Sequence, residues 1–204
     1  MVQNLYIKNF DKDYFWLLIS RISLLTKAPL IIGAVIYTLS PEQQGIWYLF
    51  LSLSAISYVA ESGFASLMTQ VLSSNAQSVV VKDGVLIGDC SKIKIIKDII
   101  LYSIKSYNKI MPVVLIANIL IGLYFLSDEL FEYKCAWLCF CAISLCNIYM
   151  MLGISLYQGL DNVANAGKFR TVFNFTNLFF TVFLLVLGFH LWSLVIGLMF
   201  SIII

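Results

Sequence analysis

The sequence predicts an all-α, polytopic membrane protein, and three observations carry that prediction. Apolar and aromatic residues make up 61% of the 204 residues and charged residues only 12%, whereas soluble domains average about 45–50% and about 25%. The mean hydropathy is +0.92. Long apolar runs, separated by polar or turn residues, recur along the whole chain. Such a chain needs an apolar solvent outside the fold as well as an apolar core.

Six apolar segments are expected to be membrane helices, because about 20 apolar residues are needed to cross a bilayer core of about 30 Å. They cover about residues 15–37, 46–68, 110–127, 135–157, 171–188 and 192–204. The first contains Arg21 and Lys27 and has no cleavage site behind it, so it is predicted to remain as a helix rather than act as a signal. The sixth has only 13 residues. The prediction is therefore one six-helix lobe whose sixth helix is incomplete.

Segment 73–109 is predicted to be a cytoplasmic loop followed by an amphipathic helix. Residues 73–91 are polar and contain glycine, which is typical of a loop. From Lys92 the pattern is helical, with a charged sector of about 120° and an apolar side. The charged sector holds Lys94, Lys97, Asp98, Lys105 and Lys109, and the apolar side holds Ile93, Ile96, Ile99, Ile100 and Ile104. Such a helix either lies along an anionic leaflet or extends the third span into the cytoplasm.

The distribution of basic residues predicts that the N-terminus is cytoplasmic. Lys8 and Lys12 precede the first span, six lysines lie in segment 73–109, and Lys168 and Arg170 lie between the fourth and fifth spans. The alternate connections, 41–45, 128–134 and 188–191, contain a single lysine among them. Basic and non-basic connections therefore alternate along the chain.

Charged residues inside the predicted spans are the main functional candidates, because they require water, a counter-ion or an anionic ligand. Arg21 and Lys27 lie on the first span, and Glu61 lies on the second at a depth comparable with that of Arg21. A structural Arg21–Glu61 pair and a functional role for both residues remain open alternatives. Lys27 has no obvious carboxylate at its depth and is the better candidate for binding a ligand.

Several spans also carry an uncharged polar face. The residues predicted to line a polar path are Ser23, Ser54, Ser57, Asn147, Asn174 and Asn177. Hydrogen bonding between helices is the alternative role for these side chains.

Composition and motifs exclude several other functions. The net charge of +2 is too small to indicate a nucleic-acid-binding protein, and no basic run is interleaved with aromatic residues. Motifs such as HExxH, GxSxG and the P-loop are absent from the sequence, so an enzyme is not expected. Four of the five cysteines crowd into residues 135–146 without a nearby histidine or a CxxC pair in the sequence, so neither a metal nor a cofactor is expected.

Three stretches resemble polysaccharide flippases of the multidrug/oligosaccharidyl-lipid/polysaccharide exporter superfamily. Residues 39–47 are similar to the family's first outer loop, residues 61–70 to the end of its second helix, and residues 157–170 with 187–192 to its fourth-to-sixth-helix region. The best single match is to O-antigen (Wzx-type) flippases. Gln70 stands where the family often has arginine, and the chain corresponds to one lobe, about half the family length.

The resemblance implies one lobe of a V-shaped, two-lobe transporter in a bacterial inner membrane. It implies alternating-access transport of undecaprenyl-pyrophosphate-linked oligosaccharide, an O-antigen or similar unit. The related lipid II flippase has basic residues six apart on its first helix, a spacing that Arg21 and Lys27 match. These two residues are accordingly expected to hold the anionic headgroup, with Glu61 as counter-ion or proton-coupling carboxylate.

The partners implied by the resemblance are membrane lipids, a second lobe or a second copy of the chain, and polysaccharide polymerase machinery. A drug/cation antiporter of the same superfamily is an alternative function. A non-transporting scaffold is another. Because the sixth span is short, a truncated chain that is inactive alone is also expected.

Overall fold

The computed structural model describes residues 2–61, 63–76, 79–82 and 85–204, with side chains from residue 13 onward except at 58–61, 80–82 and 85. Helices account for most of the chain. They are α1 (Val2–Thr38), α2 (Pro41–Glu61), α3 (Phe64–Asn75), α4 (Cys90–Phe125), α5 (Phe131–Gly159), α6 (Val163–Val186) and α7 (Trp192–Ile203). Between α3 and α4 lie the short strands β1 (Val79–Lys82) and β2 (Val85–Gly88). The all-α prediction is confirmed, with this hairpin as the one sheet in the described residues.

Four helices in the described part of the chain are long and apolar enough to cross a membrane. They are Asp13–Thr38 of α1, Cys90–Phe125, Phe131–Gly159 and Val163–Val186. The helix α7 is strongly apolar but has 12 residues. Helix lengths and composition therefore agree with a membrane protein, as the sequence predicts.

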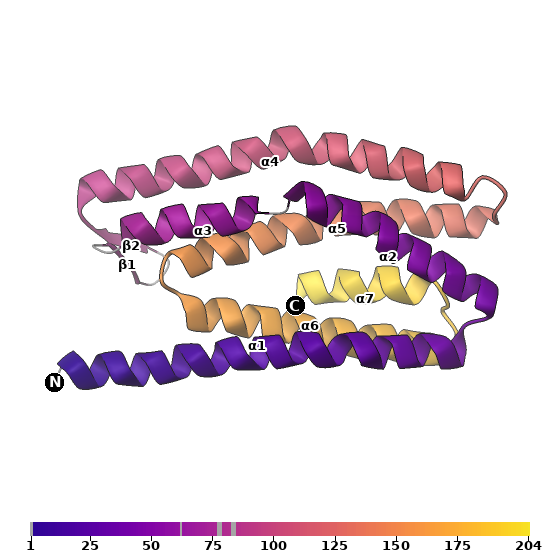
Figure 1. Ribbon diagram of the computed structural model, residues 1–204, viewed down its shortest axis with the longest axis horizontal. Helices are drawn as coiled ribbons and strands as arrows, with labels where there is room; N and C mark the ends of the chain where they lie inside the picture. The colour runs from indigo at the N-terminus through magenta and orange to yellow at the C-terminus, as the bar shows by residue number, and fades with distance from the viewer. Residues whose placement is uncertain (1, 62, 77–78, 83–84) are drawn as a thin grey trace.

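The helices run along the long axis of the molecule, and successive helices run in opposite directions, except that α3 continues the direction of α2 (Figure 1). The hairpin and the α5–α6 connection lie at the same end as the N-terminus, whereas the α1–α2, α4–α5 and α6–α7 connections lie at the other end (Figure 1). We call these the hairpin end and the opposite end. The parts of α4 and α6 nearest the hairpin end carry Lys92, Lys94 and Lys97, and Lys168 and Arg170.

The second predicted span, 46–68, is divided into two helices. The helix α2 ends at Glu61, and α3 begins at Phe64 after Gly63, whose φ is 88°. A residue with a Cβ adopts this left-handed conformation at a cost, whereas glycine adopts it freely. Apolar residues continue on both sides of Gly63, so hydropathy alone does not reveal the break.

Segment 73–109 contains two strands where residues 73–91 are predicted to form a loop, and its helix is continuous with the third span. The strands β1 and β2 pair antiparallel, with Lys82 opposite Val85; the sequence between those residues is Asp-Gly, which is favoured in two-residue hairpin connections. The helix α4 then begins after Asp89 and continues for 36 residues. Of the two alternatives, the charged segment from Lys92 is therefore an extension of the third span.

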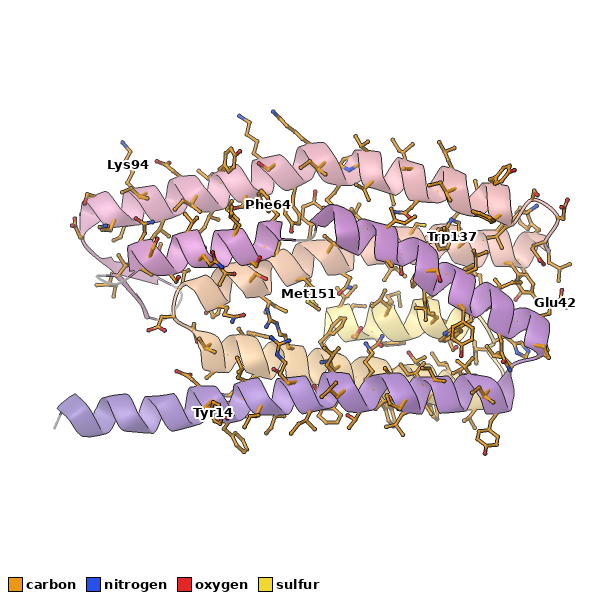
Figure 2. The ribbon with its side chains drawn as sticks, viewed as in Figure 1. Tyr14, Glu42, Phe64, Lys94, Trp137 and Met151 are labelled. Atoms are coloured by element: carbon orange, nitrogen blue, oxygen red, sulfur yellow. The ribbon has the colours of Figure 1, made fainter. Side chains whose placement is uncertain are left out.

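Helix α5 is the centre of the packing, since it contacts α2, α3, α4, α6 and α7. Two clusters of buried side chains hold the helices together. One contains Trp47, Phe50 and Trp137, and the other contains Leu72 and Ile96. Trp137 points into the bundle toward α2 (Figure 2).

Helix α1 packs along α6, although the two are far apart in sequence (Figure 1). The crossing is close at Gly167, where a Cβ would lie 2.9 Å from the carbonyl carbon and oxygen of Trp16. Small residues allow this approach between membrane helices. This packing decides which polar side chains of α1 meet those of α6.

Candidate functional site

Two pockets with a basic side chain in their lining lie along α1, and the first contains two arginines. This arginine pocket has a volume of about 450 Å³ and lies between α1, α3, α5 and α6. Its lining comprises Arg21, Gly63, Ala65, Ser66, Thr69, Gln70, Ser155, Gln158 and Arg170. Thr69 fixes the wall, because its Oγ1 donates to the carbonyl of Ser155 at 3.0 Å and so joins α3 to α5.

The charge of the arginine pocket is uncompensated among the described residues. Arg21 and Arg170 both line it, and no described lining residue is a carboxylate. Two like charges between membrane helices are costly unless water or an anion accompanies them. A guanidinium presents a planar fork of donors that matches phosphate and carboxylate oxygens. The arrangement therefore favours an anion with several acceptor oxygens.

The second pocket, which we call the Lys27 cavity, has a volume of about 510 Å³ and is lined by α1, α2, α5, α6 and α7. Its polar lining residues are Lys27, Ser54, Ser144, Asn177 and Thr181. Most of the remaining lining is apolar or aromatic and includes Trp47, Tyr48 and Phe140.

The ammonium of Lys27 is the only charged group among the described lining residues of this cavity. Its Nζ lies 5.4 Å from the ring centroid of Phe173. That geometry allows a cation–π interaction. An aromatic ring moderates the cost of the buried charge without neutralising it, so the cavity retains an affinity for anions.

The structure separates the two cations that the sequence predicts to act together. Arg21 and Lys27 are six residues apart on α1, which corresponds to about 9 Å along the axis and about 120° around it. Arg21 shares its pocket with Arg170, whereas Lys27 faces Asn177 and Ser54. The side chain of Glu61 lies outside the described residues, so its role as counter-ion stays a prediction.

The uncharged candidates divide between pocket walls and helix contacts. Ser54 and Asn177 line the Lys27 cavity. In contrast, the Nδ2 of Asn174 donates to the Oγ of Ser23 at 3.1 Å, and both side chains are buried. This hydrogen bond joins α6 to α1. Asn147 is buried in the bundle on α5.

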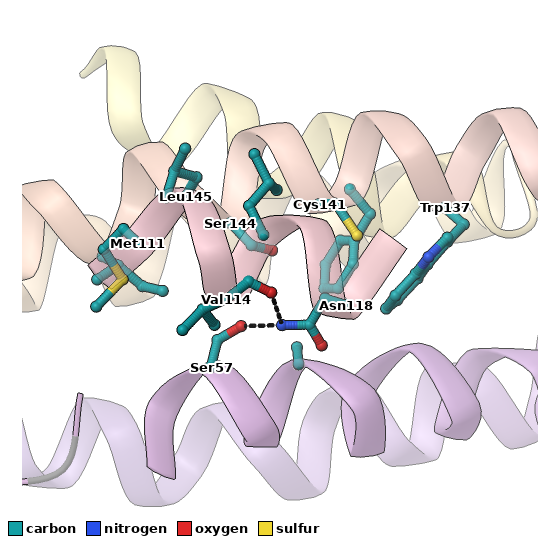
Figure 3. Close-up of a pocket in the computed structure, with 12 residues that line it drawn as sticks. Ser57, Met111, Val114, Asn118, Trp137, Cys141, Ser144 and Leu145 are labelled. Carbon is teal, nitrogen blue, oxygen red and sulfur yellow. Dashed lines mark hydrogen bonds between the residues drawn. The ribbon is translucent and has the colours of Figure 1, made fainter. Parts of the chain in front are cut away.

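Ser57 belongs to a small polar cavity of about 20 Å³ between α2, α4 and α5 (Figure 3). The Nδ2 of Asn118 donates to the Oγ of Ser57 at 2.6 Å and to the carbonyl of Val114 at 3.1 Å. Among the described residues, the Oδ1 of Asn118 and the Nε1 of Trp137 have no hydrogen-bond partner. Ser57 therefore takes part in a contact between α2 and α4, close to Ser54 and Ser144 of the Lys27 cavity.

Arg170 is the charged residue of the arginine pocket that the sequence prediction does not include among its binding residues. It lies at the start of the polar stripe of the fifth span, together with Asn174 and Asn177. That stripe is visible in the sequence. The packing of α6 against α1, which places Arg170 and Arg21 in one pocket, is not.

Comparisons with protein-family models, with curated proteins and with solved structures give no match to this chain. The resemblance to polysaccharide flippases therefore stays a prediction from the quoted motifs.

Proposed function

We propose that the protein translocates undecaprenyl-pyrophosphate-linked oligosaccharide, an O-antigen or similar surface polysaccharide unit, across the bacterial inner membrane. The observation that carries this proposal is the arginine pocket, in which Arg21 and Arg170 line one polar pocket without a described carboxylate. A diphosphate supplies acceptor oxygens for both guanidinium groups. Gln70 and Gln158 in the same lining offer further donors to the headgroup.

In this proposal Lys27 is the second residue to bind the headgroup, after the two arginines. It lies about 9 Å further along α1 than Arg21, and its cavity is lined by Ser54 and Asn177, which hydrogen-bond to sugar hydroxyls. The headgroup passes from the two arginines to the lysine while the sugars occupy the polar wall. A second lobe or a second copy of the chain faces this wall, and the two alternate in opening to either side.

The orientation of the chain in the membrane is inferred from the charges at the two ends of the molecule. The parts of α4 and α6 nearest the hairpin end contain Lys92, Lys94 and Lys97, and Lys168 with Arg170. Cytoplasmic loops carry the excess of lysine and arginine in most membrane proteins. The hairpin end is accordingly cytoplasmic, and the arginine pocket lies nearer to that side than the Lys27 cavity does.

Binding of undecaprenyl pyrophosphate to the purified chain in nanodiscs tests the proposal. Arg170→Gln should weaken binding about 10–100-fold, because a hydrogen bond to a charged group contributes about 1.5–3 kcal/mol. The matched control is Lys168→Gln on the same helix, since the Nζ of Lys168 lies 5.3 Å from the ring of Trp16 and Lys168 does not line the arginine pocket. Equal binding by the wild type and Arg170→Gln would contradict the headgroup site.

The antiporter alternative is separated from the flippase by a genetic experiment. Deletion of the gene should remove surface polysaccharide from the cell. Drug hypersensitivity with normal polysaccharide would instead favour a drug/cation antiporter, whose cavity requires carboxylates; Glu61 is the residue on which that alternative depends.

A further inference from the structure

The outer side of α4 at the hairpin end carries a row of lysines. Lys94, Lys97, Lys105 and Lys109 are all exposed, and we call them the α4 lysine face. At 100° per residue they occupy a sector of about 120°. The opposite side of the helix is packed against α3 and α5. Figure 2 shows the side chain of Lys94 projecting away from the bundle.

The inner side of this part of α4 is fully buried, which fixes the orientation of the lysines. Ile96 and Ser103 are each 0% exposed and Tyr107 is 2% exposed. These residues lie about 180–220° around the helix from Lys94. The lysine face is therefore directed away from the protein along its whole length.

Large apolar side chains are exposed among these lysines. Leu101 is 64% exposed, Tyr102 is 62% exposed, and Ile104, which the sequence places on the apolar side, is 41% exposed. Tyrosine is enriched at membrane–water interfaces, where its ring is apolar and its hydroxyl stays hydrated. The combination of exposed lysines with exposed large apolar side chains and a tyrosine is more typical of a membrane–water interface than of a face that contacts only water.

The length of the apolar surface beyond the lysines locates the membrane boundary. From residue 110 onward the exposed large residues of α4 are Ile110, Val113, Ile116, Leu120, Tyr124 and Phe125. Residues 110–125 rise about 24 Å, which is about 6 Å less than the hydrocarbon core of about 30 Å. The core therefore extends about one turn further, to the level of Lys105 and Lys109, whose flexible chains carry their ammonium groups into the headgroup layer.

The lysine face has little compensating charge. Asp98 is the one acidic residue within its sector. Among the described side chains, none forms an ion pair with the four lysines. Lys97 and Lys94 lie about 12 Å and about 16 Å beyond Lys105 along the axis. Their charges extend the positive field outward from the boundary.

We propose that the α4 lysine face binds anionic phospholipid headgroups, with Lys105 and Lys109 at the level of the lipid phosphates and Tyr102 in the interface. The ligand class is a phospholipid with a net negative charge, such as phosphatidylglycerol. Clusters of lysine next to a membrane helix attract such lipids by about 1 kcal/mol per residue, which is about a fivefold effect for each lysine. This inference does not depend on the proposed transport function.

Native mass spectrometry of the detergent-purified chain with mixed micelles of phosphatidylglycerol and phosphatidylcholine tests the proposal. The wild type should retain phosphatidylglycerol in preference to phosphatidylcholine, and Lys105→Gln with Lys109→Gln should reduce that preference about 25-fold. Arginine at both positions should preserve it. The control is Lys92→Gln with Lys134→Gln, because Lys92 lies on the inner side of α4 and Lys134 at the opposite end of the molecule.

An unchanged lipid preference in the Lys105/Lys109 glutamine variant would overturn the proposal and leave a solvated face. Lysine-dependent binding of an acidic protein without any lipid preference would also overturn it. Undecaprenyl pyrophosphate binding is measured in parallel on the wild type and on Arg170→Gln, whose substitution lies in the arginine pocket. Equal binding by these two proteins, with the lipid preference lost in the Lys105/Lys109 glutamine variant, would count against the transport proposal alone.

Discussion

Asp13 on α1 caps the start of α6, since its Oδ1 accepts a hydrogen bond from the backbone N–H of Ala164 at 3.0 Å. The residue at the usual capping position of α6, Asn162, makes no capping hydrogen bond with its own side chain. Helix α1 therefore supplies the hydrogen-bond acceptor for a backbone N–H at the start of α6. This contact and the Ser23–Asn174 hydrogen bond join the same two helices.

Asp13→Ala should lower the free energy of unfolding by about 0.5–2 kcal/mol, the range observed when a helix cap is lost. Asp13→Asn should retain much of the stability, because its amide oxygen can accept the same bond. Equilibrium unfolding in mixed micelles measures both. A full effect in the asparagine variant would show that the charge, rather than the hydrogen bond, matters.

Gly167→Ala should destabilise the protein by about 1–3 kcal/mol, because the added methyl group meets the backbone of Trp16 and forces α1 away from α6. Gly33→Ala on α1 is the matched control. A Cβ at Gly33 has nothing within 4 Å, so that substitution should be neutral or stabilise by up to about 1 kcal/mol. Similar unfolding free energies for the two variants would contradict a close α1–α6 crossing.

The hydrogen bond between Asn118 and Ser57 predicts energetic coupling between α4 and α2. A double-mutant cycle with Asn118→Ala and Ser57→Ala should give about 0.6–1.7 kcal/mol, the range for hydrogen bonds between membrane helices. Unfolding free energies of the wild type, both single variants and the double variant give the value. Strict additivity would mean that Asn118 is held by the Val114 carbonyl alone.

Low pH should destabilise the start of α4, because protonation of the Asp89 carboxylate weakens the cap that it forms with Ser91. The backbone N–H of Ser91, and then its hydroxyl, donate to the Asp89 carboxylate; together with the positive charge of Lys92 they lower its pKa below the usual value. The ionised carboxylate therefore stabilises the folded chain above the unfolded pKa of about 3.9. That contribution is lost as the pH falls through the lower, folded pKa.

An NMR titration of the Asp89 carboxyl carbon measures this pKa directly. It should lie below the value of an aspartate in an unfolded peptide, and Ser91→Ala should raise it, because the hydroxyl donor is removed while the backbone donor remains. A pKa at or above the unfolded value would contradict the cap.

The sequence patterns predicted which residues face the interior of the bundle better than they predicted which residues contact one another. The polar stripes of the first and fifth spans correctly marked Ser23, Asn174 and Asn177 as inward-facing. The pairing of Ser23 with Asn174 depended on the α1–α6 contact, which is non-local and leaves no periodicity in the sequence. Arg170 was therefore visible as a polar residue but not as the neighbour of Arg21.

The β1–β2 hairpin and the break between α2 and α3 each have a signal in the sequence that the hydropathy pattern does not reveal. The sequence of the hairpin segment contains a Val-Val-Val run and an Asp-Gly pair, which are typical of a hairpin. However, the segment around it has a polar composition that indicates a loop. The α2–α3 break occurs at Gly63 inside an apolar run that is long enough to be one span. At Gly63 the backbone conformation, rather than burial, decides where the helix breaks.

The separation of Arg21 from Lys27 leads to a prediction about additivity. Arg21 and Arg170 line one pocket, so they contact one ligand and their effects on undecaprenyl pyrophosphate binding should not add. The double variant Arg21→Gln with Arg170→Gln should depart from the sum of the single effects by about 0.5–3 kcal/mol. Lys27 lines a different cavity and lies about 9 Å along the helix from Arg21, so Arg21→Gln with Lys27→Gln should be additive within about 0.5 kcal/mol. Dissociation constants for the five variants and the wild type in nanodiscs provide both cycles. Strong coupling between Arg21 and Lys27, with additivity between Arg21 and Arg170, would mean that the headgroup bridges the two cations of α1 and that Arg170 only supports the wall.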